Sequence, residues 1–236
     1  MRLLEVNQVS KRFGGLTANQ DVSFNVDAGQ VVGLIGPNGA GKTTLFNCVA
    51  GFFAPNAGSI VLNGRNIAGL PPEACARAGV ARTFQVARTF TSMTACENVM
   101  TAAMLLEHKV ARARAAAMEW LAFANLARFA DKPAGSMTIS EQRRLAVARA
   151  LAIQPRILLM DEVMAGLNPS EVREAVEVVL KIRDRGIACL IVEHVLEGIM
   201  PIADKIVVLD RGVKIAEGTP EQVSNDPQVI TAYLGD

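Results

Sequence analysis

The sequence predicts an α/β fold in which a largely parallel sheet carries a phosphate-binding loop. The first sign is the segment GPNGAGKTT at 36–44, which follows an apolar run at 31–35 and precedes a helix-like segment. The second is a pair of short, wholly apolar runs at 157–160 and 187–192, each followed at once by polar or charged side chains. Such runs are typical of buried parallel strands, whose carboxyl ends face the ligand crevice.

The composition fits a single domain over residues 1–236. Half of the 236 residues are apolar, and the chain contains no internal repeat or linker. Lysine and arginine total 24 against 23 acidic residues, so no basic field for nucleic acid is expected. The four cysteines have no metal-ligand spacing, and no apolar stretch approaches the roughly eighteen residues of a membrane span. We therefore expect a cytoplasmic protein without a secretory leader, which serves a membrane only through partners.

The first elements in order are strands over about 2–27, in which Val22, Phe24 and Val26 alternate with polar residues. Phe13 lies near the end of the first of these strands. Its ring can stack on a flat base or pack into the core, and the sequence leaves both readings open.

The loop at 36–44 matches G-x-x-x-x-G-K-[ST] between a buried strand and a helix start, the context that the motif requires. Its glycines let several N–H groups converge on one anion, and the helix adds its dipole. We expect Lys42 to reach the β- and γ-phosphates and the Thr43 hydroxyl to take one position on Mg²⁺. The expected nucleotide-binding residues here are Gly36, Pro37, Asn38, Gly39, Ala40, Gly41, Lys42, Thr43 and Thr44.

Beyond the loop helix, which Gly51 is expected to end, the segment 59–67 predicts a hairpin with an Asn-Gly turn. The segment 79–85 predicts another strand, which ends at Gln85. The amide of Gln85 suits the shell of a metal ion or a nearby water, although a solvated side chain is the alternative.

From about residue 97 to 153 the pattern is helical, with a break at 132–135 and a new helix from about Ser140. We expect a helical insertion in the core here. The Ser140 hydroxyl can cap the new helix, whose N-terminus is a second potential phosphate site.

Two carboxylates follow the apolar run at 157–160, where a parallel strand would meet the crevice. We expect Asp161 to hold the Mg²⁺ shell beside Thr43 and Glu162 to accept a proton from the attacking water. A solvated acidic turn is the alternative. His194 follows the next buried run and can hydrogen-bond a γ-phosphate or a water near it, although a lone histidine is usually structural.

The C-terminal segment reads as a closing hairpin at 205–216 around Asp210-Arg211-Gly212. Thr219 is expected to cap a short helix, and Asp226-Pro227 to begin the last one.

These residues, in this order, resemble the ATP-binding subunit of an ABC transporter over about 3–235. The similarity extends to the branch that serves high-affinity branched-chain amino acid importers. It implies a P-loop NTPase (RecA-like) core with an antiparallel β subdomain and an α-helical subdomain inserted at about 86–153, and ATP and Mg²⁺ as cofactors. The segments that carry it are KRFGGLTA at 11–18, ARTFQ at 81–85, GLNP at 166–169, VEH at 192–194 and IAEGTP at 215–220.

The resemblance also implies roles for single residues. Phe13 would stack on adenine, Gln85 would link the metal site to the membrane subunits, and Asp161 would be the metal-associated aspartate. Glu162 would be the catalytic base and His194 the switch histidine.

The family works as a head-to-tail pair, with ATP between the phosphate loop of one subunit and the signature sequence of the other. Asn168 would belong to the loop that crosses this interface. Where the family has Leu-Ser-Gly-Gly-Gln, this chain has Met-Thr-Ile-Ser-Glu at 137–141. Thr138 keeps a hydroxyl, but Ser140 replaces the second glycine, whose N–H must approach the γ-phosphate closely. We therefore expect a heterodimer in which this departure weakens the partner's site, with a homodimer as the alternative.

The resemblance thus implies an ATP hydrolase that energises uptake of branched-chain or related amino acids. Its partners would be a second ATP-binding subunit, two membrane permease subunits and, indirectly, a substrate-binding protein, but no nucleic acid. It would lie in the cytoplasm, peripheral on the inner face of the cell membrane. The alternatives are an importer ATPase for urea, amides or other solutes, an exporter or lipid-transport ATPase, and an ATP-binding regulatory subunit with weak hydrolysis.

Overall fold

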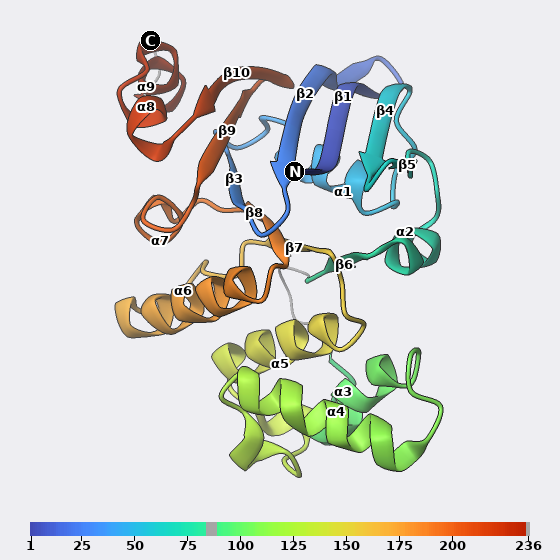
Figure 1. Ribbon diagram of the computed structural model, residues 1–236. Helices are drawn as coiled ribbons and strands as arrows, with labels where there is room; N and C mark the ends of the chain where they lie inside the picture. Colours follow the sequence, from blue (N-terminus) through green and yellow to red (C-terminus); the bar gives the residue numbers. More distant parts are fainter. Residues whose placement is uncertain (84–88, 235–236) are drawn as a thin grey trace.

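Two β-sheets enclose the first core helix (Figure 1). The computed structural model describes residues 1–83 and 89–234. The smaller sheet is antiparallel, in the order β2-β1-β4-β5. Its strands alternate buried and exposed residues where the sequence predicts alternation, for example at Val22, Phe24 and Val26 of β2. Its bounds are β1 (Arg2–Phe13), β2 (Leu16–Asp27), β4 (Ala57–Leu62) and β5 (Arg65–Asn66).

The larger sheet has the order β10-β9-β3-β8-β7-β6, and only β10 runs antiparallel to its neighbour. Every residue of β3, β7 and β8 is buried, which confirms the wholly apolar runs as core strands. Because these three strands are parallel neighbours, their carboxyl ends meet at one edge. The bounds are β3 (Val31–Ile35), β6 (Val80–Arg82), β7 (Ile157–Asp161), β8 (Ala188–Val192), β9 (Lys205–Asp210) and β10 (Val213–Gly218).

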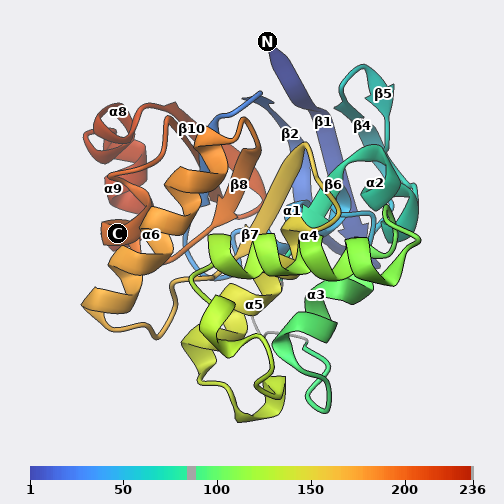
Figure 2. The same ribbon diagram turned by 60° about the horizontal axis from the view of Figure 1, so that its bottom comes forward.

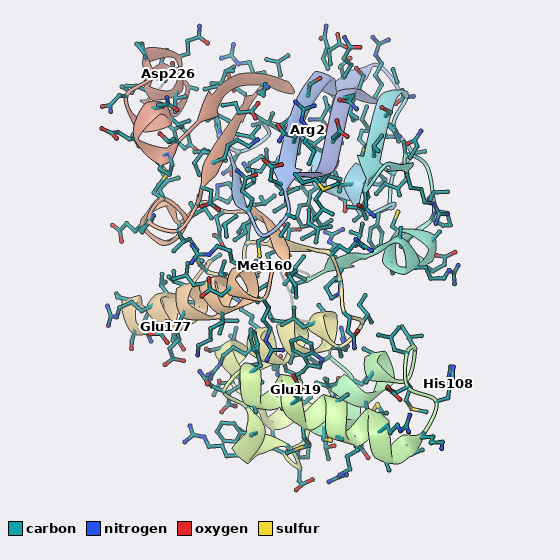
Figure 3. All side chains as sticks on the ribbon, viewed as in Figure 1. Arg2, His108, Glu119, Met160, Glu177 and Asp226 are labelled. Carbon is teal, nitrogen blue, oxygen red and sulfur yellow. The ribbon has the colours of Figure 1, made fainter. Side chains whose placement is uncertain are left out.

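Between β6 and β7 the chain forms a helical part, which projects below the sheets in Figure 1 and comes forward in Figure 2. Glu119 and His108 mark this part in Figure 3, whereas Met160 lies on β7, near where the sheet and the helices meet. Its elements are α3 (Ala95–Ala103), α4 (Val110–Phe123), η1 (Ala127–Phe129), η2 (Ala134–Ser136) and α5 (Ile139–Leu151).

In the described part of the chain, the remaining helices are α1, which lies between the sheets, and five that lie around them. Helix α1 is the next element after β3, which is the strand, loop and helix order that the phosphate-loop motif requires. Their bounds are α1 (Lys42–Val49), α2 (Pro72–Ala78), α6 (Pro169–Asp184), α7 (Leu196–Ile199), α8 (Pro220–Ser224) and α9 (Pro227–Leu234).

The buried apolar residues form two clusters. One packs the smaller sheet and α1 onto the larger sheet, with Leu4, Phe46 and Leu190 as members. The other packs the opposite face of the larger sheet against helices and continues into the helical part, through Ile191 and Leu121. The phosphate loop is therefore anchored between two packed layers.

Strand β6 ends at Arg82, and the strand end expected at Gln85 lies outside the described residues. The helix expected from about Ser140 is confirmed, because α5 begins at Ile139. Ser140 is not its cap, because Thr138 occupies the N-cap position. The Asn63-Gly64 turn, the Thr219 cap and the last helix from Pro227 are confirmed.

Candidate nucleotide site

The phosphate loop is held in a shape that glycine alone can adopt at two points. Gly36 has φ +145° and Gly41 has φ +94°, both outside the range of ordinary L-residues. A Cβ on Gly36 would stand 2.0 Å from the Leu209 carbonyl oxygen, and one on Gly41 would stand 2.4 Å from that of Ala18. The loop thus packs directly on backbone from β9 and β2, and Gly41 caps the N-terminus of α1.

Lys42 lies inside this loop with its side chain buried. Its Nζ donates hydrogen bonds to the carbonyl oxygens of Gly36 at 2.7 Å and Pro37 at 2.9 Å. Burial lowers the pKa of Lys42, while the nearby Glu162 and Asp161 carboxylates act in the opposite direction. The ammonium group is therefore pre-positioned over the loop, where a phosphate would be bound.

A cavity of about 560 Å³ opens onto the loop. Phe13, which the sequence predicts to stack on adenine, lines it, and Glu162 and His194 line it together with the loop residues 38–44. The Phe13 ring is 42% exposed and packs edge-on against Phe53 at 5.2 Å, so it is not a core residue. Converging N–H groups, a lysine and a helix N-terminus are the donor set that suits a polyphosphate.

A second cavity of about 640 Å³ lies on the other side of the loop, against α9. It is lined by loop residues 37–40 together with residues such as Arg211 and Thr231. The predicted aromatic, acid and histidine all line the first cavity, which is therefore the nucleotide candidate.

Glu162 and His194 meet at the carboxyl ends of β7 and β8. The Glu162 N–H donates to the Val192 carbonyl oxygen at 2.9 Å, and Glu162 takes a left-handed φ of +49°. The His194 Nε2 lies 3.1 Å from the Glu162 Oε1. This contact orients the carboxylate toward the cavity that holds Lys42 and Thr43.

Asp161, the last residue of β7, is buried and paired with Arg82, a residue that the sequence reasoning missed. The Arg82 Nη2 lies 3.0 Å from the Asp161 Oδ2, and its Nη1 bonds the Asn47 side chain. Its guanidinium stacks on Phe46 at 4.8 Å. Burial raises the pKa of Asp161, and Arg82 opposes this rise.

Of the predicted oxygen donors for Mg²⁺, the Thr43 hydroxyl lines the cavity, whereas the Asp161 carboxylate is paired with Arg82 and does not line it. Both groups are of the kind that suits a hard cation. Within residues 1–83 and 89–234, no group of three or more His, Cys, Asp or Glu side chains could hold a metal ion. A Mg²⁺ here would therefore depend on water and phosphate oxygens as well. Gln85, the third predicted metal contact, lies outside the described residues.

The signature region lies apart from this cavity, at the start of α5. The Thr138 Oγ1 accepts from the Glu141 N–H at 3.2 Å, and the Glu141 Oε2 accepts from the Thr138 N–H at 2.9 Å. Lys132 also donates to this oxygen at 2.9 Å. Although burial disfavours the charged form, the bonds from Lys132 and Thr138 lower the pKa of Glu141.

Asn168 is the N-cap of α6, where its Oδ1 accepts from the Ser170 N–H at 2.9 Å and the Glu171 N–H at 3.0 Å. Neither Asn168 nor the signature residues Thr138 and Ser140 line the cavity that opens onto the chain's own phosphate loop. That separation fits a site completed by a second subunit.

In the part of the chain that the structure covers, no helix is both long and apolar enough to cross a bilayer.

Two family models match the chain. The model described as ABC transporter matches residues 19–165, and the one described as branched-chain amino acid ATP-binding cassette transporter matches residues 213–236.

The chain is 44% identical to BraF of Pseudomonas aeruginosa, a high-affinity branched-chain amino acid transport ATP-binding protein, over 99% of this chain and 98% of the relative. It is 41% identical to LivG of Escherichia coli K12, described in the same words, with the same coverage. It is 34% identical to LptB of Haemophilus influenzae, a lipopolysaccharide export ATP-binding protein, over 100% of this chain and 98% of the relative. A crystal structure of the ADP conformation of an ABC-transporter ATP-binding cassette superposes with a TM-score of 0.91 at 29% identity, covering 100% of both chains.

Proposed function

The chain belongs to the ABC transporter family of ATP-hydrolysing subunits, and from this we propose that it powers uptake of branched-chain or related amino acids through membrane permease subunits. The observation that carries the proposal is the single cavity that joins the phosphate loop to the Glu162–His194 pair. The match of residues 213–236 to the branched-chain amino acid model supports the cargo.

We propose that the loop N–H groups and Lys42 bind the phosphates of ATP and that Phe13 stacks on the base. Lys42 already lies over the loop through its bonds to Gly36 and Pro37, so little reorganisation is needed for it to contact a phosphate oxygen. Phe13 lines the cavity and is 42% exposed, which supports a stacking role for its ring.

We propose that Thr43, Asp161 and Gln85 hold Mg²⁺ directly or through water. Bound there, the ion would supply neutralisation of phosphate charge. Arg82 fixes the Asp161 carboxylate at the end of β7 and offsets part of its charge.

Glu162 is proposed as the general base that accepts a proton from the attacking water. Its contact with His194 at 3.1 Å holds the carboxylate toward the cavity. Because Glu162 lines the same cavity as the phosphate loop, the structure supports this role in hydrolysis.

We propose that the chain pairs head to tail with a different ATP-binding subunit on the cytoplasmic face of the membrane, and that a substrate-binding protein outside the membrane supplies the permease. In this chain Ile139 is 71% exposed at the first position of α5, and Glu141 places a carboxylate near the same helix N-terminus. Both features oppose a close approach by a partner's γ-phosphate. The site on this chain's own phosphate loop would then be the more active one.

A Glu162→Gln variant tests the proposal. We expect it to bind ATP with unchanged affinity, to lose about 100-fold or more in hydrolysis, and to stop leucine uptake in vesicles that contain the assembled transporter. Glu197→Gln, at an exposed position on α7, is the matched control.

Normal hydrolysis in Glu162→Gln would contradict the role of Glu162. Uptake of urea or an amide instead of leucine, or movement of a lipid, would contradict the proposed amino acid cargo. ATP binding without turnover in the wild type would indicate a regulatory subunit.

A further inference from the structure

Glu193 is a buried acidic residue that has no part in the proposed mechanism so far. It follows β8, directly before His194, and its side chain is 0% exposed. Its Oε1 accepts a 2.7 Å hydrogen bond from the Met164 N–H, whereas its Oε2 has no hydrogen-bond partner among the described residues. A half-satisfied buried carboxyl group carries a desolvation penalty, so an apolar residue here would pack at lower cost.

The bond from Met164 joins two loops that leave neighbouring strands. Asp161 of β7 and Val192 of β8 are partners in register, so Glu162 and Glu193 leave the sheet side by side. The Glu162 N–H is bound to the Val192 carbonyl oxygen at 2.9 Å. The turn after β7 is thus tied to the end of β8 twice, once by its backbone and once by the Glu193 side chain.

The Met164 side chain adds a packing contact to the same connection. It is 0% exposed, and its Sδ lies 2.4 Å from the point that a Cβ on Gly198 would occupy. Gly198 lies on α7, four residues after His194, and its missing side chain leaves the space that Met164 fills. The turn therefore packs against the chain on both sides of His194.

We propose that Glu193 is a positioning residue, which fixes the turn at 162–168 to the His194 loop and so keeps the Glu162 carboxylate within hydrogen-bonding distance of His194. This rests on the proposed function, because Glu193 acts through the Glu162–His194 pair. The turn at 162–168 also connects α5 and α6 to the Glu162–His194 pair. The Arg143 Nη1 on α5 donates to the Ala165 carbonyl oxygen of the turn at 2.6 Å, and Asn168 at the end of the turn begins α6.

The first test replaces Glu193 with leucine, which keeps the volume but removes the acceptor. In the chain assembled with its permease subunits, we expect Glu193→Leu to lower kcat by about 10- to 100-fold while the Kd for ATP stays within about twofold, because the phosphate loop is untouched. Glu193→Gln keeps an acceptor for the Met164 N–H and should restore at least about a third of kcat. The exposed Glu197→Leu is the matched control.

A double-mutant cycle with His194→Ala separates a positioning role from general loss of packing. If Glu193 acts through His194, adding Glu193→Leu to His194→Ala should lower kcat no further. Losses that multiply would overturn the proposal, as would a kcat within about twofold of wild type in Glu193→Leu. A normal kcat in His194→Ala together with a low kcat in Glu193→Leu would also overturn it. The proposed function is tested separately, because ATP-driven uptake by the wild type would support it whatever the outcome of this cycle.

Gly198→Ala is the second variant if Glu193→Leu does not fold. Its new methyl group displaces Met164 from the opposite side and leaves Glu193 intact. We expect a drop in kcat at unchanged Kd for ATP. An unchanged kcat in folded Gly198→Ala would overturn the proposal.

Discussion

At the scale of single residues, three buried ionisable groups lie in or beside the site, namely Lys42, Asp161 and Glu193, and burial does not shift their pKa values in the same direction. Burial lowers the pKa of Lys42 and raises that of Asp161, and in each case a neighbouring opposite charge counteracts the shift. Burial raises the pKa of Glu193 to about 7, against the backbone hydrogen bond from Met164. No cation among the described residues offsets the burial penalty of Glu193, so its ionisation is coupled to folding.

This coupling predicts a pH dependence of stability. The folded pKa of Glu193, about 7, lies above its ordinary value of 4.5. The contribution of Glu193 to the free energy of unfolding is therefore fully present below pH 4.5 and is lost as pH rises through 7. The shift corresponds to about 3 kcal/mol. The test is denaturant unfolding of the wild type and Glu193→Gln between pH 4.5 and 8. The difference in free energy of unfolding, Glu193→Gln minus wild type, should rise by about this amount over that range. A difference that does not change with pH would contradict the shift.

Several site residues could be predicted from the sequence because each follows a recognisable element. Lys42 belongs to a motif, and Asp161, Glu162 and His194 lie within two residues of the ends of wholly apolar runs. Arg82 could not be predicted, because its contact with Asp161 exists only once β6 pairs with β7 and the guanidinium stacks between aromatic rings.

At the scale of elements, α5 and α3 begin in the same way. Each starts with a capping box, Thr138 with Glu141 in α5 and Thr94 with Glu97 in α3. The spacing Thr-x-x-Glu is readable from sequence, so the cap of α5 could have been assigned to Thr138.

The paired boxes give a matched prediction. Thr138→Ala and Thr94→Ala should each lower the free energy of unfolding by about 1 kcal/mol in denaturant titrations. Only Thr138→Ala should also change ATP turnover at the partner's site, because Thr138 lies in the signature region. Equal effects of the two substitutions on turnover would mean that Thr138 acts through stability alone.

The element boundaries show where sequence periodicity was sufficient. Strands β3, β7 and β8 were predicted to within a residue because continuous apolar runs have clear ends. Strand β6 pairs with β7 as far as Arg82 and Leu159, and the strand end expected at Gln85 lies outside the described residues.

At the scale of the whole molecule, the phosphate loop and the signature helix lie in different parts of the chain. The loop is anchored between the two sheets, and α5 lies in the helical part (Figure 1). The order of the elements could be predicted from the sequence, but the packing of α5 beside β6 depends on long-range contacts. This separation supports the proposed pairing with a second ATP-binding subunit, in which the changes at Ile139 and Glu141 would affect only the site on the partner's loop.

The most direct measurement is the nucleotide affinity and ATP turnover of Lys42→Ala in the assembled transporter, beside the equivalent lysine substitution in the partner subunit. Lys42→Ala should weaken ATP binding to this chain and abolish most of the turnover, because its ammonium group lies over the loop, whereas the partner's substitution should leave a substantial rate. Unchanged affinity and turnover in Lys42→Ala would contradict the proposal that this cavity is where ATP is bound and hydrolysed.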